Sequence, residues 1–278
     1  MSPRKYSRPA RLLSAVLAGG AMIACSADST SGPTSIATAG SAQLLFSNTH
    51  EPTGMTAVVS QAFNSTTLAS WYSLPAGVRL LSDTSTPLSP APYGRMIYPA
   101  GFKGGVAPAT TTSTSFAGKG YKEVYVRLGV RLSSNFFGHP TSTNKVVHFW
   151  IYNPQANRVF LSFEGAGANP LHLQVRCQGS PDDGKCGHLR ANTGASGVVT
   201  RGAWHVVEVR VRANTQGLSN GVVEAWIDGV RTHFYNNIRL DVGGWMLMSW
   251  SPTWGGVGGT VPAAMSMDMD HIYVSGRR

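Results

Sequence analysis

The sequence predicts an all-β domain whose strands pack as a sandwich or jelly roll. Several stretches alternate strictly between aliphatic and other residues, which is the period of two expected of strands with one face in a core. Only 13% of the 278 residues are charged, against a typical ~25%, and turn-forming residues are abundant. Long helical patterns are absent from the sequence, and a chain of this length fits a single large β domain.

Residues 1–24 are predicted to be a secretory signal peptide. A basic segment precedes an apolar run, residues 12–24, that is too short for a membrane-spanning helix of about 20 residues. The run ends in Met-Ile-Ala followed by Cys25, which resembles the bacterial lipobox, where the cysteine becomes the lipidated first residue. We therefore expect residues 25–42 to be a lipidated cysteine with a flexible tether and residues 43–278 to be the folded domain. The alternative is an ordinary signal peptide with an incidental cysteine.

These features predict a protein of the bacterial cell envelope, held at the outer membrane or cell surface by lipid, or else secreted. Without residues 1–24, which hold four basic and no acidic residues, 19 basic residues face 13 acidic ones, a net charge of +6. This excess favours polyanionic partners, for an exported protein acidic polysaccharide or lipid headgroups rather than nucleic acid. A solvated basic face is the plainer explanation. We expect a monomer that contacts the membrane only through its lipid.

The strands are expected mainly in the second half of the chain. Residues 43–120 are rich in turns and contain short candidate strands at 67–72, 78–81 and 95–98. Further strands are predicted at 122–132, 145–152, 158–164, 171–177, 204–212, 222–228, 230–235, 245–251 and 267–275. Asp228-Gly229 predicts a tight hairpin, because this dipeptide readily adopts the positive φ angles of a two-residue turn.

The sides of these strands that face away from the aliphatic residues carry side chains suited to ligand binding rather than plain solvation. They are Tyr125, Arg127, Arg131, His148, Trp150, Tyr152, Gln174, Arg176 and Arg210. Trp226 is a further candidate, as a platform for sugar rings. Cys177 and Cys186 bracket a polar turn, and in an oxidising compartment they predict a structural disulfide.

The succession YKEVYVRLGVRL (121–132), VVHFWIY (146–152), GAWHVVEV (202–209), NGVVEAWIDGV (220–230) and MDMDHIYVS (267–275) resembles the concanavalin A-like lectin/glucanase superfamily. It is most similar to the polysaccharide-lyase-like, heparin lyase-like branch. The hairpin with Trp226 two residues before Asp228-Gly229 is the most specific part. The resemblance implies a jelly-roll β-sandwich of two antiparallel sheets, one of them concave and able to receive sugar chains.

Lyases of this kind cleave uronate polysaccharides by β-elimination, which requires a base, an acid and a clamp for the carboxylate. The resemblance implies His148 or Tyr152 as base, Tyr125 or Tyr152 as acid, and Arg127 with Arg176 or Gln174 as clamp. The remaining substrate-binding candidates are Arg131, Trp150, Arg210 and Trp226. Arg127 and Arg131 keep the spacing of an alginate-lyase motif, but Val146 stands where that pattern has glutamine.

Each candidate also has a structural interpretation. The alternative for His148 is a hydrogen-bonded sheet residue, for the arginines pairing with Glu123 or Glu208, and for Trp226 packing in the core. Trp245, Trp250 and Trp254 fit either a cleft wall or packing. The competing function is a non-catalytic carbohydrate-binding or adhesion module. A glycoside hydrolase is disfavoured, because the Glu-x-Asp-x-x-Glu strand is absent.

The sequence predicts no cofactor. Asp268 and Asp270 lie on one side of the last predicted strand, where they could serve as calcium ligands or as ion-pair partners of Arg277 or Arg278. No zinc-ligand spacing, nucleotide-binding loop or nucleophile elbow is found in the sequence.

Overall fold

The structure, a computed structural model, describes residues 50–61, 63, 78–81, 92–112, 119–150, 158–180 and 183–278. The predicted signal peptide, Cys25, the tether, the candidate strand 67–72 and Tyr152 lie outside these residues. Within them the chain is almost entirely β, with one short helix, α2 (Asp183–Cys186).

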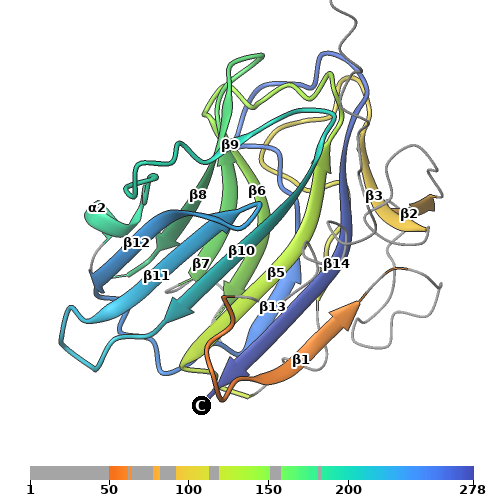
Figure 1. The fold of residues 1–278 in the computed structure, drawn as a ribbon. Coiled ribbons are helices and arrows are strands. Elements are labelled where there is room, and N and C mark those ends of the chain that lie inside the picture. The colour runs from red at the N-terminus through yellow and green to blue at the C-terminus, as the bar shows by residue number, and fades with distance from the viewer. Residues whose placement is uncertain are drawn as a thin grey trace, which may run out of the picture. The chain divides into compact units, whose positions relative to one another are not determined.

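The strands form two antiparallel sheets that pack face to face (Figure 1). The eight-stranded sheet has the order β12 (Val230–Ile238), β11 (Gly221–Ile227), β10 (Trp204–Arg212), β5 (Glu123–Leu132), β14 (Met265–Arg277), β3 (Tyr93–Tyr98) and β2 (Val78–Leu81), with β1 (Thr56–Gln61) also on β14. The six-stranded sheet has the order β4 (Thr111–Thr112), β13 (Leu247–Trp250), β6 (Thr143–Trp150), β7 (Arg158–Glu164), β8 (Leu171–Gln178) and β9 (Val198–Val199). This is the predicted jelly-roll β-sandwich.

The strands predicted from residue 122 onward are all present: β7 and β10 have the predicted bounds, and the others differ by one to three residues at one or both ends. The Asp228-Gly229 hairpin is confirmed, since both residues have positive φ, 51° and 79°, and they join β11 directly to β12. The short predicted strands 78–81 and 95–98 correspond to β2 and most of β3.

The core lies between the sheets and is built from the aliphatic sides of the strands. Val126 and Leu128 of β5 and Leu161 of β7 belong to one buried cluster. Trp245, Trp250 and Trp254 join it with at most 1% of their surface exposed. These three residues are therefore core packing and not a cleft wall, and burying such large rings is a major source of stability.

The predicted disulfide between Cys177 and Cys186 is confirmed, with the two Cα atoms 5.2 Å apart. It ties the end of β8 to α2. Among the residues that the structure describes, no helix has the length and apolar character to cross a membrane.

Candidate functional site

The predicted site residues are divided between two sheets. Tyr125, Arg127 and Arg131 lie on β5, Arg210 on β10 and Trp226 on β11, all in the eight-stranded sheet. His148 and Trp150 on β6, with Gln174 and Arg176 on β8, belong to the six-stranded sheet. Leaving Trp150 aside, each set lies on the side of its sheet away from the core, so one groove cannot hold both. The expected convergence of His148 with Tyr125 and Arg127 does not occur.

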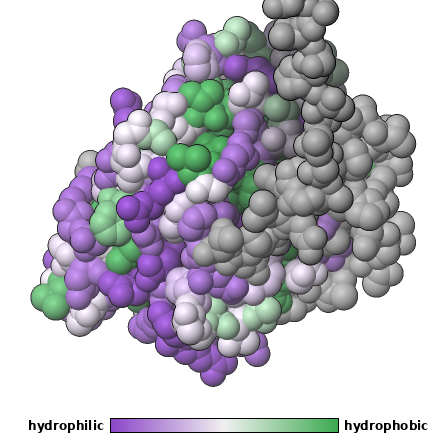
Figure 2. Space-filling model, in the orientation of Figure 1, coloured by the Kyte–Doolittle hydropathy of each residue, from purple (hydrophilic) through white to green (hydrophobic). Residues whose placement is uncertain are grey.

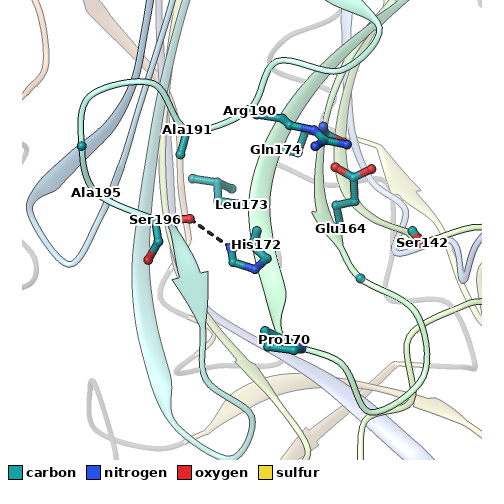
Figure 3. A pocket seen from close by; sticks show the side chains of 12 residues that line it. Ser142, Glu164, Pro170, His172, Leu173, Gln174, Arg190, Ala191, Ala195 and Ser196 are labelled. Atoms are coloured by element: carbon teal, nitrogen blue, oxygen red, sulfur yellow. Dashed lines mark hydrogen bonds between the residues drawn. The ribbon is translucent and has the colours of Figure 1, made fainter. Parts of the chain in front are cut away.

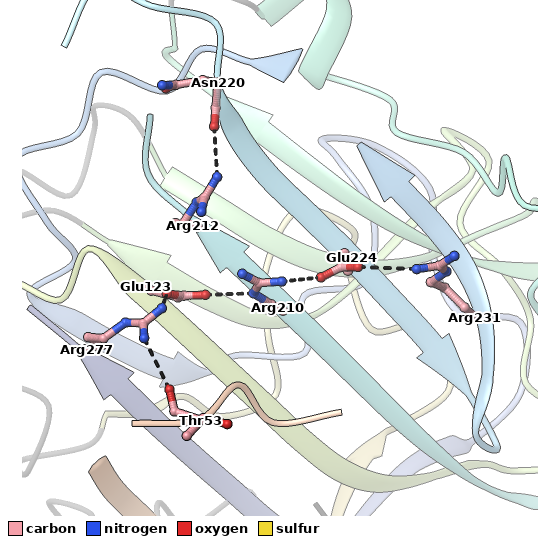
Figure 4. Close-up of polar contacts among 8 residues, drawn as sticks. All are labelled: Thr53, Glu123, Arg210, Arg212, Asn220, Glu224, Arg231 and Arg277. Carbon is pink, nitrogen blue, oxygen red and sulfur yellow. Dashed lines mark hydrogen bonds and ion pairs between the residues drawn. The ribbon is translucent and has the colours of Figure 1, made fainter. Parts of the chain in front are cut away.

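On the outer face of the eight-stranded sheet, charged side chains pair with one another. Arg210 donates to Glu123 at 2.7 Å and to Glu224 at 2.6 Å, and Arg277 also pairs with Glu123 (Figure 4). Figure 2 shows mostly hydrophilic residues over the described part of this side. These contacts raise the pKa of Arg210 despite burial, which acts in the opposite direction. Arg210 is thus a cross-strand connector.

Arg131 is paired in the same way. Its guanidinium lies 2.9 Å from Asp268 and packs against the rings of Tyr93 and Trp204, 5.1 and 4.8 Å from their centroids. Arg95 donates to both oxygens of Asp268, at 2.6 and 2.8 Å. The partners of Asp268 are therefore Arg95 and Arg131, not Arg277 or Arg278 as the sequence suggested. Among the described residues, no three His, Cys, Asp or Glu side chains gather to hold a metal ion.

Residues just before β1 cover the centre of this face. His50 stacks on Trp226 with ring centroids 4.5 Å apart and bonds to Glu208 at 3.0 Å. Tyr125 donates to the same carboxylate, and its pKa is raised by burial and by Glu208. Burial disfavours the charged form of Arg127 as well, and because this form is the protonated one, its pKa is lowered. Trp226 is therefore buried outside the core cluster, beneath His50.

The outer face of the six-stranded sheet has a different character. Backbone pairing places His148 of β6 beside Phe160 of β7, and Phe160 beside Arg176 of β8. One step along the sheet, the same register aligns Lys145, Ser162 and Gln174. Two neighbouring rows of side chains, polar except for Phe160, therefore cross β6, β7 and β8.

Phe160 is the centre around which this face is arranged. The ring of His148 stacks on it with centroids 5.4 Å apart. Lys145 Nζ lies 5.3 Å and Arg176 Cζ 5.7 Å from the Phe160 centroid. The aromatic ring attracts both cations and holds them over the sheet.

Arg176 is fixed in place by the segment after the disulfide. Its Nε donates to the Gly187 carbonyl at 2.7 Å, and Nη2 donates to His188 Nε2 at 3.0 Å. Nη1 donates to the hydroxyl of Thr143 on β6. Burial lowers the pKa of this guanidinium, which nevertheless stays charged at neutral pH.

A hollow of about 580 Å³ opens at the β7–β8 side of this face, lined among others by Glu164, His172, Gln174 and Arg190 (Figure 3). His172 Nδ1 is 3.0 Å from the Ser196 carbonyl. Because a carbonyl only accepts, Nδ1 carries the hydrogen and Nε2 of the neutral ring keeps its lone pair. The fold therefore sets the tautomer of a histidine in a hollow.

Two buried polar side chains next to this hollow lack partners. Gln174 is 1% exposed and Ser162 is 0% exposed. Neither amide atom of Gln174 and no lone pair or hydrogen of the Ser162 hydroxyl is bonded within the described part of the chain. Each such group costs about 1–3 kcal/mol. These unpaired groups make the hollow a candidate site for a polar ligand.

A second hollow of about 320 Å³ lies over Phe160, with Lys145 and Arg176 in its lining. Strand β7 lines both hollows, with Phe160 in one and Glu164 in the other. His188 links them, since it bonds to Arg176 and lies 3.7 Å from Glu164. We call these two hollows together the sheet groove. Its lining has more basic side chains (Lys145, Arg176, Arg190) than acidic ones (Glu164).

Lys145, His172 and Arg190 were not among the residues selected from the sequence. His172 could have been found, because it alternates with Gln174 and Arg176 along one strand. Lys145 could not: counted by twos it belongs with Val147 on the core side. A β-bulge between Lys145 and Val147 shifts the register and turns Lys145 outward.

No family model matches the chain, and no curated protein matches its sequence. Solved structures match its fold. The PL-14 alginate lyase from Aplysia kurodai has a TM-score of 0.56 at 13% identity, covering 80% of this chain and 100% of that one. The endo-β-1,4-glucuronan lyase from the fungus Trichoderma reesei has 0.55 at 14%, covering 80% and 96%. The alginate lyase Aly36B has 0.53 at 16%, covering 78% and 95%. This chain therefore has the jelly-roll fold found in polysaccharide lyases.

Proposed function

We propose that the protein is a lyase that cleaves uronate-containing polysaccharide by β-elimination in the sheet groove. The observation that carries the proposal is the side-by-side placement of His172, with Nε2 available as an acceptor, and Gln174, whose buried amide is unpaired among the described residues. A base and a hydrogen-bond donor for a carboxylate are the two groups that this reaction needs first. The fold shared with alginate and glucuronan lyases supports the same reaction class.

In the proposed mechanism, Arg190 and Gln174 hold the uronate carboxylate. Arg190 is exposed and lines the same hollow as Gln174 (Figure 3). The Arg190 guanidinium can rotate to bind one oxygen of the uronate carboxylate. This movement would expose the amide of Gln174, which can then donate to the second carboxylate oxygen. Neutralising the carboxylate acidifies the neighbouring C5 proton and stabilises the negative charge that develops when this proton leaves.

His172 Nε2 then takes the C5 proton. The C5–H electrons form the C4=C5 double bond, the C4–O bond breaks, and the leaving oxygen receives a proton. The imidazolium formed on His172 can return that proton when base and leaving group lie on one side of the sugar. Tyr152 remains a predicted acid outside the described residues, and His148 remains the alternative base.

Lys145 and Arg176 would bind the carboxylates of neighbouring sugars. They lie in the second hollow, whose residue on β7, Phe160, precedes Glu164 of the first hollow by four residues, or about 13 Å. A groove of this length with a positive lining selects an extended acidic chain over a neutral one. Lipidation at Cys25 and residence in the cell envelope complete the proposal and would place the enzyme where it meets such polymers.

The test is to add the purified protein to alginate, pectate, glucuronan, heparin and hyaluronan and follow the ultraviolet absorbance of unsaturated uronate. We expect signal on at least one polymer and a loss of about 100-fold or more in kcat for His172→Ala, as for removal of a general base. Tyr125→Phe, on the other sheet, is the matched control and should keep its activity. Thermal melts verify that both variants are folded.

The other outcomes are equally informative. Loss of activity in His148→Ala or Tyr152→Phe but not in His172→Ala would identify His148 of β6 or Tyr152, rather than His172, as the base. Loss in Tyr125→Phe alone would place the site on the eight-stranded sheet. Binding to a polymer without any absorbance change would instead support the carbohydrate-binding module.

A further inference from the structure

A basic pocket lies at one end of β5, β10 and β14, in the sheet that does not form the groove. It has a volume of about 530 Å³. Four cationic side chains line it: Lys122, Arg212, Arg277 and Arg278. The proposed lyase activity gives these residues no role.

Backbone hydrogen bonds hold the basic residues together. Lys122 N donates to the Arg277 carbonyl at 2.8 Å, and Ala213 N donates to the Lys122 carbonyl at 2.7 Å. In the sheet, Glu123 pairs with Arg212 on one side and Arg277 on the other. Three strand ends that are distant in sequence therefore present their cations at one place.

The pocket keeps a positive charge because its lining carboxylate is already paired. Glu123 is 2% exposed, and its two oxygens bond to Arg210 and Arg277 (Figure 4). Lys122 and Arg212 are exposed. The hydrogen bond that Arg212 makes goes to the neutral Asn220 carbonyl at 3.3 Å. Exposed ammonium and guanidinium groups in one hollow suit the oxygens of a phosphate.

Residues near the start of the described chain lie beside the pocket. Arg277 Nη1 donates to the Thr53 carbonyl at 3.2 Å. The predicted tether, residues 25–42 with the expected lipidation site Cys25 at its start, has 17 residue steps, and a flexible linker of that length would span about 20–25 Å on average. A lipid on Cys25 would therefore keep this pocket within reach of the membrane surface.

We infer that the basic pocket binds the phosphate headgroups of an anionic membrane. The inference does not depend on lyase activity. Each basic side chain close to an anionic bilayer strengthens binding about fivefold, so the pocket alone binds weakly. The tether raises its effective concentration at the surface, and this makes the weak contact significant. The domain would then be held with one defined end toward the lipid.

The test uses the full chain with Cys25→Ser, so that no lipid is attached, and sedimentation with phosphatidylcholine vesicles with or without phosphatidylglycerol. Binding is expected only with phosphatidylglycerol and should weaken with salt. Removing two cations with Lys122→Gln/Arg212→Gln should weaken it about 25-fold. The control Lys103→Gln/Arg231→Gln removes the same charge from exposed positions outside the pocket and should have a much smaller effect.

Equal losses in both double variants would mean that net charge, not the pocket, attracts the vesicles, and the inference would be wrong. So would an absence of binding to phosphatidylglycerol. Saturable binding of inorganic phosphate that depends on Lys122 and Arg212, without vesicle binding, would assign the pocket to a soluble anion. Displacement by soluble alginate through the same two residues would assign it to polysaccharide.

Discussion

At the scale of single residues, the Gln174 side chain should lower the stability of the fold while serving the proposed activity. Its amide is buried without a partner among the described residues, so Gln174→Met keeps the size of the side chain and removes the unpaired group. We expect the free energy of unfolding to rise by about 1–2 kcal/mol and kcat/KM to fall. Urea titrations and the absorbance assay measure the two effects.

Gln178→Met is the control, because Gln178 is an exposed residue at the end of the same strand. Neither stability nor kcat/KM should change in it by a comparable amount. A less stable Gln174→Met protein would mean that the amide is satisfied within the chain, and the proposed carboxylate contact would lose its support.

Individual residues also mark the limit of what alternation can predict. It correctly placed Gln174 and Arg176 on the side of β8 away from the core. It put Tyr125 and His148 on the corresponding sides of their strands, but the parity of a strand does not tell which sheet the strand joins. The inner or outer side is a local property, whereas the pairing of β5 with β10 and of β6 with β7 depends on contacts between distant segments.

At the scale of elements, the disulfide-closed segment after β8 should position Arg176. The disulfide joins Cys177, the next residue, to Cys186, and the Arg176 side chain bonds to Gly187 and His188 just beyond it. Replacing both cysteines with serine should lower the free energy of unfolding by about 2–3 kcal/mol, as for a loop of this size. We expect KM for the polymer to rise several-fold with a smaller change in kcat, measured by the absorbance assay.

Arg176→Gln provides the control for this effect. If the disulfide acts through Arg176, removing the cysteines in the Arg176→Gln background should produce no further rise in KM. Independent, additive increases would show that the loop contributes to binding by another route. Reducing the wild-type protein should reproduce the result of the double serine variant.

The elements themselves were largely predictable, because β5, β6, β8 and β10 alternate and a period of two is the physical signature of a half-buried strand. The exception is informative. The bulge in β6 reverses the side on which Lys145 lies, and no glycine or proline marks it in the sequence.

At the scale of the whole molecule, the two outer faces differ in what covers them. Ion pairs and the contacts of His50 and Glu51 occupy the eight-stranded face, while the six-stranded face keeps two hollows. Cross-strand pairs such as Arg210 with Glu224 require their strands to be neighbours. The sequence contained the charges for both faces, but only the strand order determines which charges cancel.

A buried histidine where β12 of one sheet meets β8 of the other should make the stability of the protein sensitive to acid. His233 of β12 is fully buried, bonds to the Thr232 hydroxyl at 2.7 Å and lies within reach of the backbone of Leu173 and Leu189. Burial lowers its pKa to about 4. The folded protein thus keeps His233 neutral at pH values where the unfolded chain, with an ordinary pKa near 6.5, binds a proton.

This difference stabilises the fold fully above about pH 6.5, and the contribution is lost as the pH falls toward 4, by about 3 kcal/mol. Glutamine does not titrate. The free energy of unfolding of His233→Gln should therefore lack the pH dependence caused by His233, while the pH dependence caused by the carboxylates remains. Urea unfolding of both proteins from pH 7 to pH 4 should therefore find the wild type losing about 3 kcal/mol more than the variant. If the difference in free energy of unfolding between the two proteins stays constant across this range, the His233 ring can accept a proton in the folded state. The contact between β12 and β8 would then open to water without unfolding.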